Sequence, residues 1–155
     1  MEYVMDRNSV TETLNDLIEN CKDGEYGFQT CAEHAKSADL KQFFVRRASE
    51  CASAAQELQS LVARFGGSPD TGGSATGAMH RGWVAVRGTL ALNDDKAMLS
   101  ECERGEDAAL ARYREALEEK LPPEVEQVVR RQYQGAQRNH DEVKRLRDAY
   151  AAQPA

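Results

Sequence analysis

The feature that most constrains this chain is a set of four long segments in which apolar residues recur every three or four positions. That spacing places the apolar side chains on one face of an α-helix. Four helices of this kind bury their apolar faces against one another in a bundle. The stripes run through residues 10–35, 40–65, 99–117 and 125–150. Because prolines are scarce, with four in the whole chain, the sequence predicts an all-α protein.

Residues that favour helix ends separate the stripes. A serine followed three residues later by a glutamate is a capping box, and serine or aspartate is favoured just before a helix. Paired glycines end a helix, and proline suits its first turn. In this chain these signals are the capping box of Ser9 and Glu12, the helix caps at Ser37 and at Asn93-Asp94-Asp95, the helix-ending pair Gly66-Gly67, and the first-turn proline Pro123.

The lengths of the connections predict the topology. Short turns make the first and second helices, and the third and fourth, antiparallel neighbours. The second and third helices are joined by a flexible linker over about 66–78 and by the apolar segment Met79–Leu92, which we predict to be a short extra helix that buries Trp83. One long crossover is the connectivity of a ferritin-like four-helix bundle; the alternative is a plain bundle with a wandering loop. We expect a single domain over residues 1–155, with its core at about 9–150. Met79–Leu92 either caps one end of the bundle or forms the contact in a homodimer.

Charge and composition restrict the partners. The 26 acidic and 20 basic residues give a net charge of −6, so neither nucleic acid nor an anionic membrane is expected as a partner. No apolar run approaches the roughly 20 residues that cross a bilayer. The first residues, Met1–Asn8, have no apolar signal region. The four cysteines form no paired metal motif, and Cys31 lies off the centre of its stripe, where we expect partial exposure. We therefore expect a cytoplasmic protein with reduced thiols.

Two glutamates lie on apolar stripes. Glu25 falls among the apolar residues of the first segment, and Glu106 among those of the third. A buried carboxylate must be paired, protonated or bound to a metal, because an isolated buried charge is very costly. Both end the same short motif, C-x-x-G-E, which suggests an internal two-fold relation between the two halves of the chain. That relation predicts that the first and third helices lie diagonally across the bundle, with Glu25 and Glu106 pointing at each other.

The fourth segment adds a histidine to this predicted site. His140 falls near its stripe, with Gln137 three residues earlier, where the glutamate of an E-x-x-H motif would stand in a di-metal bundle. Glu103, somewhat off the third stripe, is placed to supply another oxygen. The candidate metal ligands are thus Glu25, Glu106, His140 and Glu103.

Several stretches resemble a bacterial family of ferritin-like four-helix-bundle proteins with no assigned function. They are Leu14–Glu19, His80–Trp83, Glu101–Asp107, Gln132–Gln134 and His140-Asp141. More remotely, the chain is similar to rubrerythrin and bacterioferritin, which bind two irons through two single glutamates and two E-x-x-H motifs. The resemblance implies that Glu25 and Glu106 match the single glutamates and that His140 matches the last histidine. Nothing in the chain matches the first E-x-x-H motif.

Two hypotheses about function follow, and the sequence leaves them open. In the first, the site binds iron or manganese, which suit carboxylate ligands, and the resemblance implies a role in oxidative or metal stress. In the second, the protein is a structural or interaction bundle whose degenerate site holds carboxylates that share a proton or pair with His140. The sequence does not decide whether the protein is an enzyme.

Overall fold

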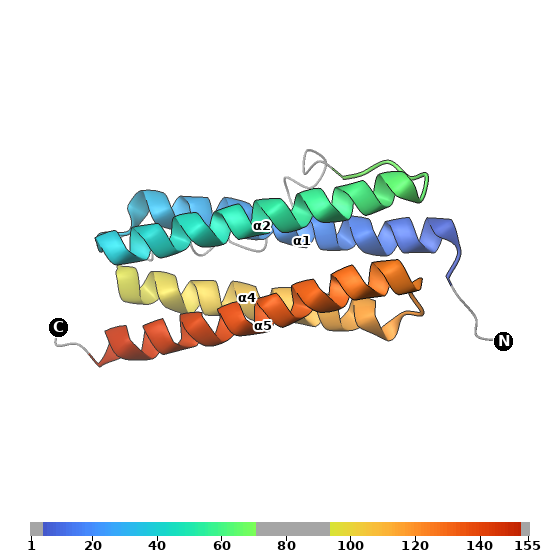
Figure 1. Ribbon diagram of the computed structural model, residues 1–155. Helices are drawn as coiled ribbons and strands as arrows, with labels where there is room; N and C mark the ends of the chain where they lie inside the picture. Colours follow the sequence, from blue (N-terminus) through green and yellow to red (C-terminus); the bar gives the residue numbers. More distant parts are fainter. Residues whose placement is uncertain (1–4, 71–93, 153–155) are drawn as a thin grey trace.

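The computed structural model describes residues 5–70 and 94–152, and this part of the chain contains four helices and no strand. They are α1 (Arg7–His34), α2 (Ala38–Arg64), α4 (Asp95–Glu118) and α5 (Pro123–Ala151). They pack side by side as an elongated bundle, with α1 and α2 forming one layer and α4 and α5 the other (Figure 1). The predicted all-α four-helix bundle is confirmed. The predicted short helix over Met79–Leu92 lies outside the described residues.

The helix ends follow the capping signals, with one correction. The side chain of Ser37 accepts the amide of Leu40 at the start of α2, and Asp94 accepts the amide of Lys96 at the start of α4. Pro123 opens α5, as predicted. The predicted cap at Ser9 is wrong, because Asp6 caps α1 and accepts the Ser9 amide at 2.8 Å. Aspartate, like serine, accepts a hydrogen bond from a backbone amide at the start of a helix. The cap at Asp6 therefore lets α1 begin at Arg7.

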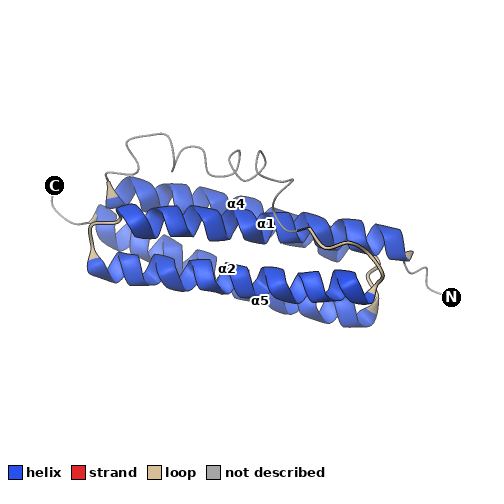
Figure 2. Ribbon diagram, turned by 90° about the horizontal axis from the view of Figure 1, so that it is seen from above, coloured by secondary structure: helices blue, strands red, loops and turns tan. Residues whose placement is uncertain are grey.

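The contacts at the helix ends fix the topology. The carboxylate of Asp95 accepts the amides of Lys36 and Ser37, both at 3.0 Å, so α4 begins beside the turn between α1 and α2. At the other end, the Met5 amide donates to the Lys120 carbonyl at 3.2 Å. The helices α2 and α4 therefore run parallel, so the end of α2 and the start of α4 lie at opposite ends of the bundle (Figures 1 and 2).

The predicted diagonal arrangement of the first and third helices is wrong. The helices α1 and α4 are neighbours and share contacts along their length. Side chains of α5 pair instead with those of α2, as in the ion pair between Arg46 and Glu142. The diagonal pairs are thus α1 with α5 and α2 with α4, because α4 begins beside the turn that follows α1 and packs along that helix.

The core divides into two apolar clusters, one toward each end of the bundle. One is built around Leu14, Leu58 and Val129, and the other around Phe28, Phe44 and Leu99. The rings of Phe28 and Phe44 stack with centroids 6.2 Å apart. Most of the polar groups considered below lie between these two clusters. None of the described helices is long and apolar enough to cross a membrane.

The beginning of the predicted linker is held against the bundle. Gly66 follows α2 with a φ of 81°, a conformation that favours glycine after a helix. The Asn15 side chain on α1 donates to the Ser68 carbonyl and accepts the amide of Asp70. The chain leaving α2 is therefore attached to α1 as far as Asp70, and the rest of the predicted linker lies outside the described residues.

Candidate functional site

A cavity crosses the middle of the bundle between the two apolar clusters. It measures about 780 Å³ and is lined by residues of all four helices. Small residues create the space, among them Gly24, Gly105 and Gly135. A Cβ atom added at Gly24 would lie 2.9 Å from the sulfur of Cys51, so α1 and α2 approach closely there. The first of the two C-x-x-G-E motifs therefore favours glycine at this position, because a side chain would crowd Cys51.

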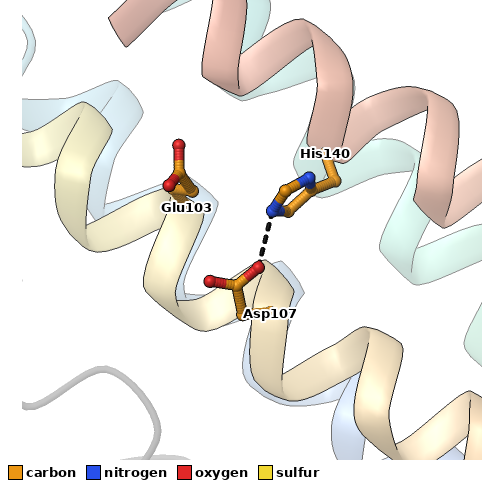
Figure 3. A group of neighbouring side chains, drawn as sticks. All are labelled: Glu103, Asp107 and His140. Carbon is orange, nitrogen blue, oxygen red and sulfur yellow. Dashed lines mark hydrogen bonds and ion pairs between the residues drawn. The ribbon is translucent and has the colours of Figure 1, made fainter.

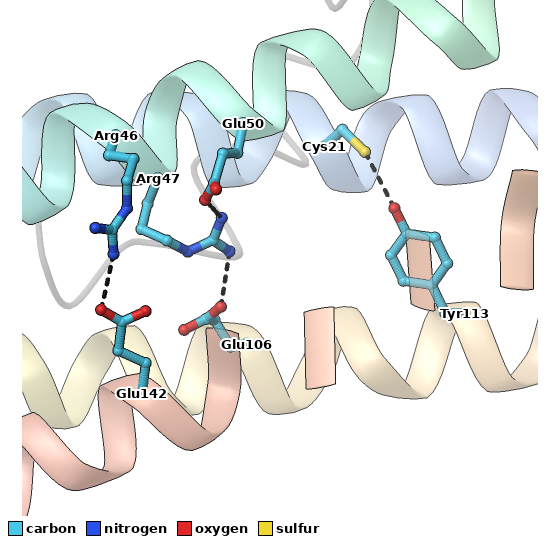
Figure 4. Close-up of polar contacts among 7 residues, drawn as sticks. All are labelled: Cys21, Arg46, Arg47, Glu50, Glu106, Tyr113 and Glu142. Carbon is cyan, nitrogen blue, oxygen red and sulfur yellow. Dashed lines mark hydrogen bonds and ion pairs between the residues drawn. The ribbon is translucent and has the colours of Figure 1, made fainter. Parts of the chain in front are cut away.

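Glu106 lies at this level and forms a buried ion pair with Arg47 of α2. Arg47 Nη2 donates to Glu106 Oε2 at 2.9 Å, and only 6% of each side chain is exposed (Figure 4). A second guanidinium nitrogen, Nη1, donates to Glu50 at 2.7 Å, and the guanidinium lies 4.9 Å from the centre of the Phe28 ring. The buried charge of Glu106 is thus compensated by Arg47, which occupies the position beside it where a metal ion was predicted.

The pair leaves polar atoms without partners. Glu106 Oε1 and Arg47 Nε are both buried and make no hydrogen bond within the described part of the chain. Burial raises the pKa of Glu106, although the positive charge of Arg47 and its hydrogen bond oppose that shift. Desolvation therefore outweighs the ion pair, as is common for charges removed from water.

The structure does not bring Glu25 to Glu106. The Glu25 carboxylate accepts a hydrogen bond from Lys22 on its own helix at 3.2 Å, and 23% of its side chain is exposed. The buried acid on α1 is Asp23, with 6% exposure. The predicted facing pair of carboxylates is therefore wrong. The two C-x-x-G-E motifs share a buried cysteine, but their glutamates lie in different surroundings, so the internal repeat does not extend to the site.

His140 joins a different set of ligands. His140 on α5, together with Glu103 and Asp107 on α4, offers three ligand atoms that lie within 4.8 Å of one another (Figure 3). Asp107 follows Glu103 by one helical turn, so both carboxylates project from the same face of α4 toward the histidine. His140 Nε2 lies 2.6 Å from Asp107 Oδ1. Among the described residues this is the one group of three or more such side chains with the spacing of metal ligands.

The three side chains differ in their exposure and in their other contacts. The side chains of His140 and Glu103 are each 18% exposed, whereas that of Asp107 is 62% exposed. Arg147, about two helical turns beyond His140 on α5, donates to Glu103 Oε1 at 2.6 Å. The other oxygen, Glu103 Oε2, is buried and has no hydrogen-bond partner among the residues that the structure describes. One buried oxygen and one imidazole are thus held at the edge of the α4–α5 interface, with an exposed carboxylate beside them.

Two residues of these arrangements were missed in the sequence. Asp107 carries a clear signal, because it follows Glu103 by four positions and therefore shares its helical face. Arg47 carries one too, since it lies between Phe44 and Cys51 on the apolar stripe of α2. A buried cation on a neighbouring helix is the simplest partner for a buried Glu106. Gln137, which stands in the place of a ligand glutamate, is exposed.

The chain matches the model of a protein family described as a domain of unknown function (DUF2383) over residues 9–119. It belongs to this family. The matched segment spans α1, α2 and α4, so Glu103, Asp107 and the ion pair of Arg47 with Glu106 lie within the family domain, and His140 lies beyond the matched residues. No curated protein matches the chain.

Proposed function

We propose that this DUF2383 protein binds one divalent metal ion, iron(II) or manganese(II), through Glu103, Asp107 and His140. The observation that carries the proposal is the convergence of three ligand atoms within 4.8 Å, contributed by two helices. The buried oxygen Glu103 Oε2, which has no hydrogen-bond partner, supports it. A bound metal ion would give this oxygen a positively charged partner.

The ligand set favours these two metals. Carboxylate oxygens suit hard ions such as manganese, and imidazole is also a good ligand for iron. Three protein ligands leave further coordination positions for water or for a small molecule. Binding replaces the contact between His140 and Asp107 with two bonds to the metal, and requires small movements of the exposed Asp107 side chain. The ferritin-like resemblance extends the proposal to a role in oxidative or metal stress.

Arg147 acts in this proposal as a supporting residue. Its hydrogen bond holds one oxygen of Glu103, which leaves the other oxygen to bind the metal. Groups that orient a metal ligand commonly change affinity by about 10-fold to 100-fold when they are removed.

Titration of the metal-free protein with manganese(II), followed by isothermal calorimetry, tests the proposal. We expect one site in the wild type, and binding weakened at least about 10-fold in Asp107→Asn and His140→Gln. Glu126→Gln is the matched control, because it removes an exposed carboxylate of α5 that pairs with Arg130, away from the cluster. Equal binding by all four proteins would refute the proposed site.

A structural or interaction bundle with a degenerate site is the second candidate. One observation favours it: Arg47 supplies the charge next to Glu106 that a metal ion would otherwise supply. In this case the protein purified without chelator contains no stoichiometric metal, and manganese(II) does not raise its melting temperature.

A further inference from the structure

Two thiols from different halves of the bundle lie in contact. Cys31 on α1 and Cys102 on α4 have their sulfur atoms 3.6 Å apart, and neither residue is exposed. The expected partial exposure of Cys31 is therefore wrong, because α4 packs beside α1 and covers it. Cys31 belongs to the hairpin of α1 and α2, and Cys102 to the hairpin of α4 and α5. A bond between them would join the two hairpins directly.

The other two thiols have different neighbours. The sulfur of Cys21 lies 3.5 Å from the Tyr113 hydroxyl, and the side chain of Cys51 faces Gly24 (Figure 4 shows Cys21 with Tyr113). All four thiols are free. A disulfide needs sulfur atoms about 2.05 Å apart, so the pair of Cys31 and Cys102 must close by about 1.5 Å.

We propose that Cys31 and Cys102 are a site of oxidative modification, and that a peroxide converts them into a disulfide that joins α1 to α4. In the first step the Cys31 thiol is oxidised to a sulfenic acid and the peroxide O–O bond is reduced, which releases water from hydrogen peroxide. In the second step the Cys102 sulfur attacks the sulfenic sulfur, the S–S bond forms, and a second water leaves. The two thiols give up two electrons, and the peroxide takes them.

The surroundings set the order of these steps. Cys31 lies nearer the end of its helix than Cys102, which lies further inside α4. Cys31 is therefore the thiol that the peroxide reaches first. Cys31 lies in the last turn of α1, which ends at His34. Helix ends open locally at a lower free energy than the whole fold, and such opening admits the peroxide.

Two hydrogen bonds at this end of the bundle limit how often peroxide reaches Cys31. The Asp95 carboxylate holds the amides of Lys36 and Ser37 just beyond α1. Breaking these two hydrogen bonds exposes Cys31 more often. Once formed, the disulfide closes a long loop and restricts the unfolded chain, which raises the melting temperature by roughly 10 °C on the chain-entropy account.

Peptide mapping of the full chain after peroxide treatment tests the proposal. Hydrogen peroxide is added to folded protein with chelator present, so that metal-catalysed oxidation is avoided, and the remaining thiols are then blocked. Trypsin places the four cysteines in four separate peptides, because cleavage sites lie between them in the sequence. Before blocking we expect an intact mass about 2 Da lower, and after blocking and digestion one linked pair of peptides containing Cys31 and Cys102, which dithiothreitol separates.

Variants sharpen the test. The double variant Cys21→Ala, Cys51→Ala keeps the pair and should form the same disulfide, whereas Cys102→Ala should form none. Asp95→Asn should speed formation several-fold. Linkage through Cys51, linkage only in denatured protein, or full oxidation of the chain without a bond between Cys31 and Cys102 would each overturn the proposal. An unchanged rate in Asp95→Asn would overturn the access route. The wild-type map gives its answer even where a variant fails to fold.

Discussion

Replacing Glu106 with leucine should strongly destabilise the protein, because it leaves the Arg47 cation buried without its acceptor. Both side chains are 6% exposed and their charged atoms are 2.9 Å apart. Removing one partner of such a pair costs about 3–5 kcal/mol. Arg47 keeps its second carboxylate, Glu50, whose side chain is 46% exposed, and its contact with the Phe28 ring. We therefore expect a loss near the lower limit, about 3 kcal/mol.

The double variant Arg47→Met, Glu106→Leu should recover most of that loss. With both charges gone, apolar side chains of similar size fill the space, and the stability should return to within about 1 kcal/mol of the wild type or exceed it. Urea unfolding followed by far-ultraviolet circular dichroism measures these differences. The control pair is Arg46 and Glu142, 2.8 Å apart but with side chains 53% and 33% exposed; Glu142→Leu should cost less than about 1 kcal/mol. The reasoning is refuted if Glu106→Leu costs no more than Glu142→Leu, or if the double variant is as unstable as Glu106→Leu.

Two further predictions concern pH and packing. Because the pKa of Glu106 is raised above its ordinary value of 4.5, its contribution to stability is full below that value and is lost as the pH rises through the raised value. The wild type should thus lose stability relative to Glu106→Gln as the pH rises above about 4.5; a pH-independent difference in urea unfolding would contradict this. Gly24→Ala should destabilise the protein by about 1 kcal/mol, since crowding against Cys51 outweighs the gain in helix propensity. Gly24→Ala should become stabilising in a Cys51→Ala background. Gly135→Ala is the control, because the nearest atom there is the end of the Arg138 side chain, and it should stabilise the protein in either background. If both substitutions lower the stability, the close contact of Gly24 with Cys51 is not the cause.

The fold was predictable because local signals and periodicity agree along the chain. Leu14 and Phe28 on α1 and Leu58 on α2 are buried, as the spacing of the two apolar stripes predicted. Short turns fixed the two hairpins, and the length of the second connection indicated a return along the bundle. Which helices are neighbours was not predictable in the same way. Sequence spacing fixes the face that a helix buries, but it does not say which of three other helices meets a given residue.

The site was predictable only in part, for the same reason. Glu106 is buried, as its position on the apolar stripe predicted, but its partner is the cation Arg47 and not the predicted histidine or metal ion. Glu25 was misplaced because helical geometry alone puts it near its stripe, whereas in the structure Asp23 turns inward and Glu25 meets Lys22. The cluster around His140 depends on the pairing of α4 with α5, which the short turn predicted, and on Asp107, which was overlooked.

The most direct test of the proposed metal site is the spin-echo spectrum of manganese(II) bound to the protein. The chain has three histidines, and His140 is the one placed in the cluster. We predict modulation from a directly bound imidazole nitrogen in the wild type and in His34→Gln, and its loss in His140→Gln. A manganese(II) spectrum without nitrogen coupling, or coupling that persists in His140→Gln, would contradict the proposal that Glu103, Asp107 and His140 hold the metal.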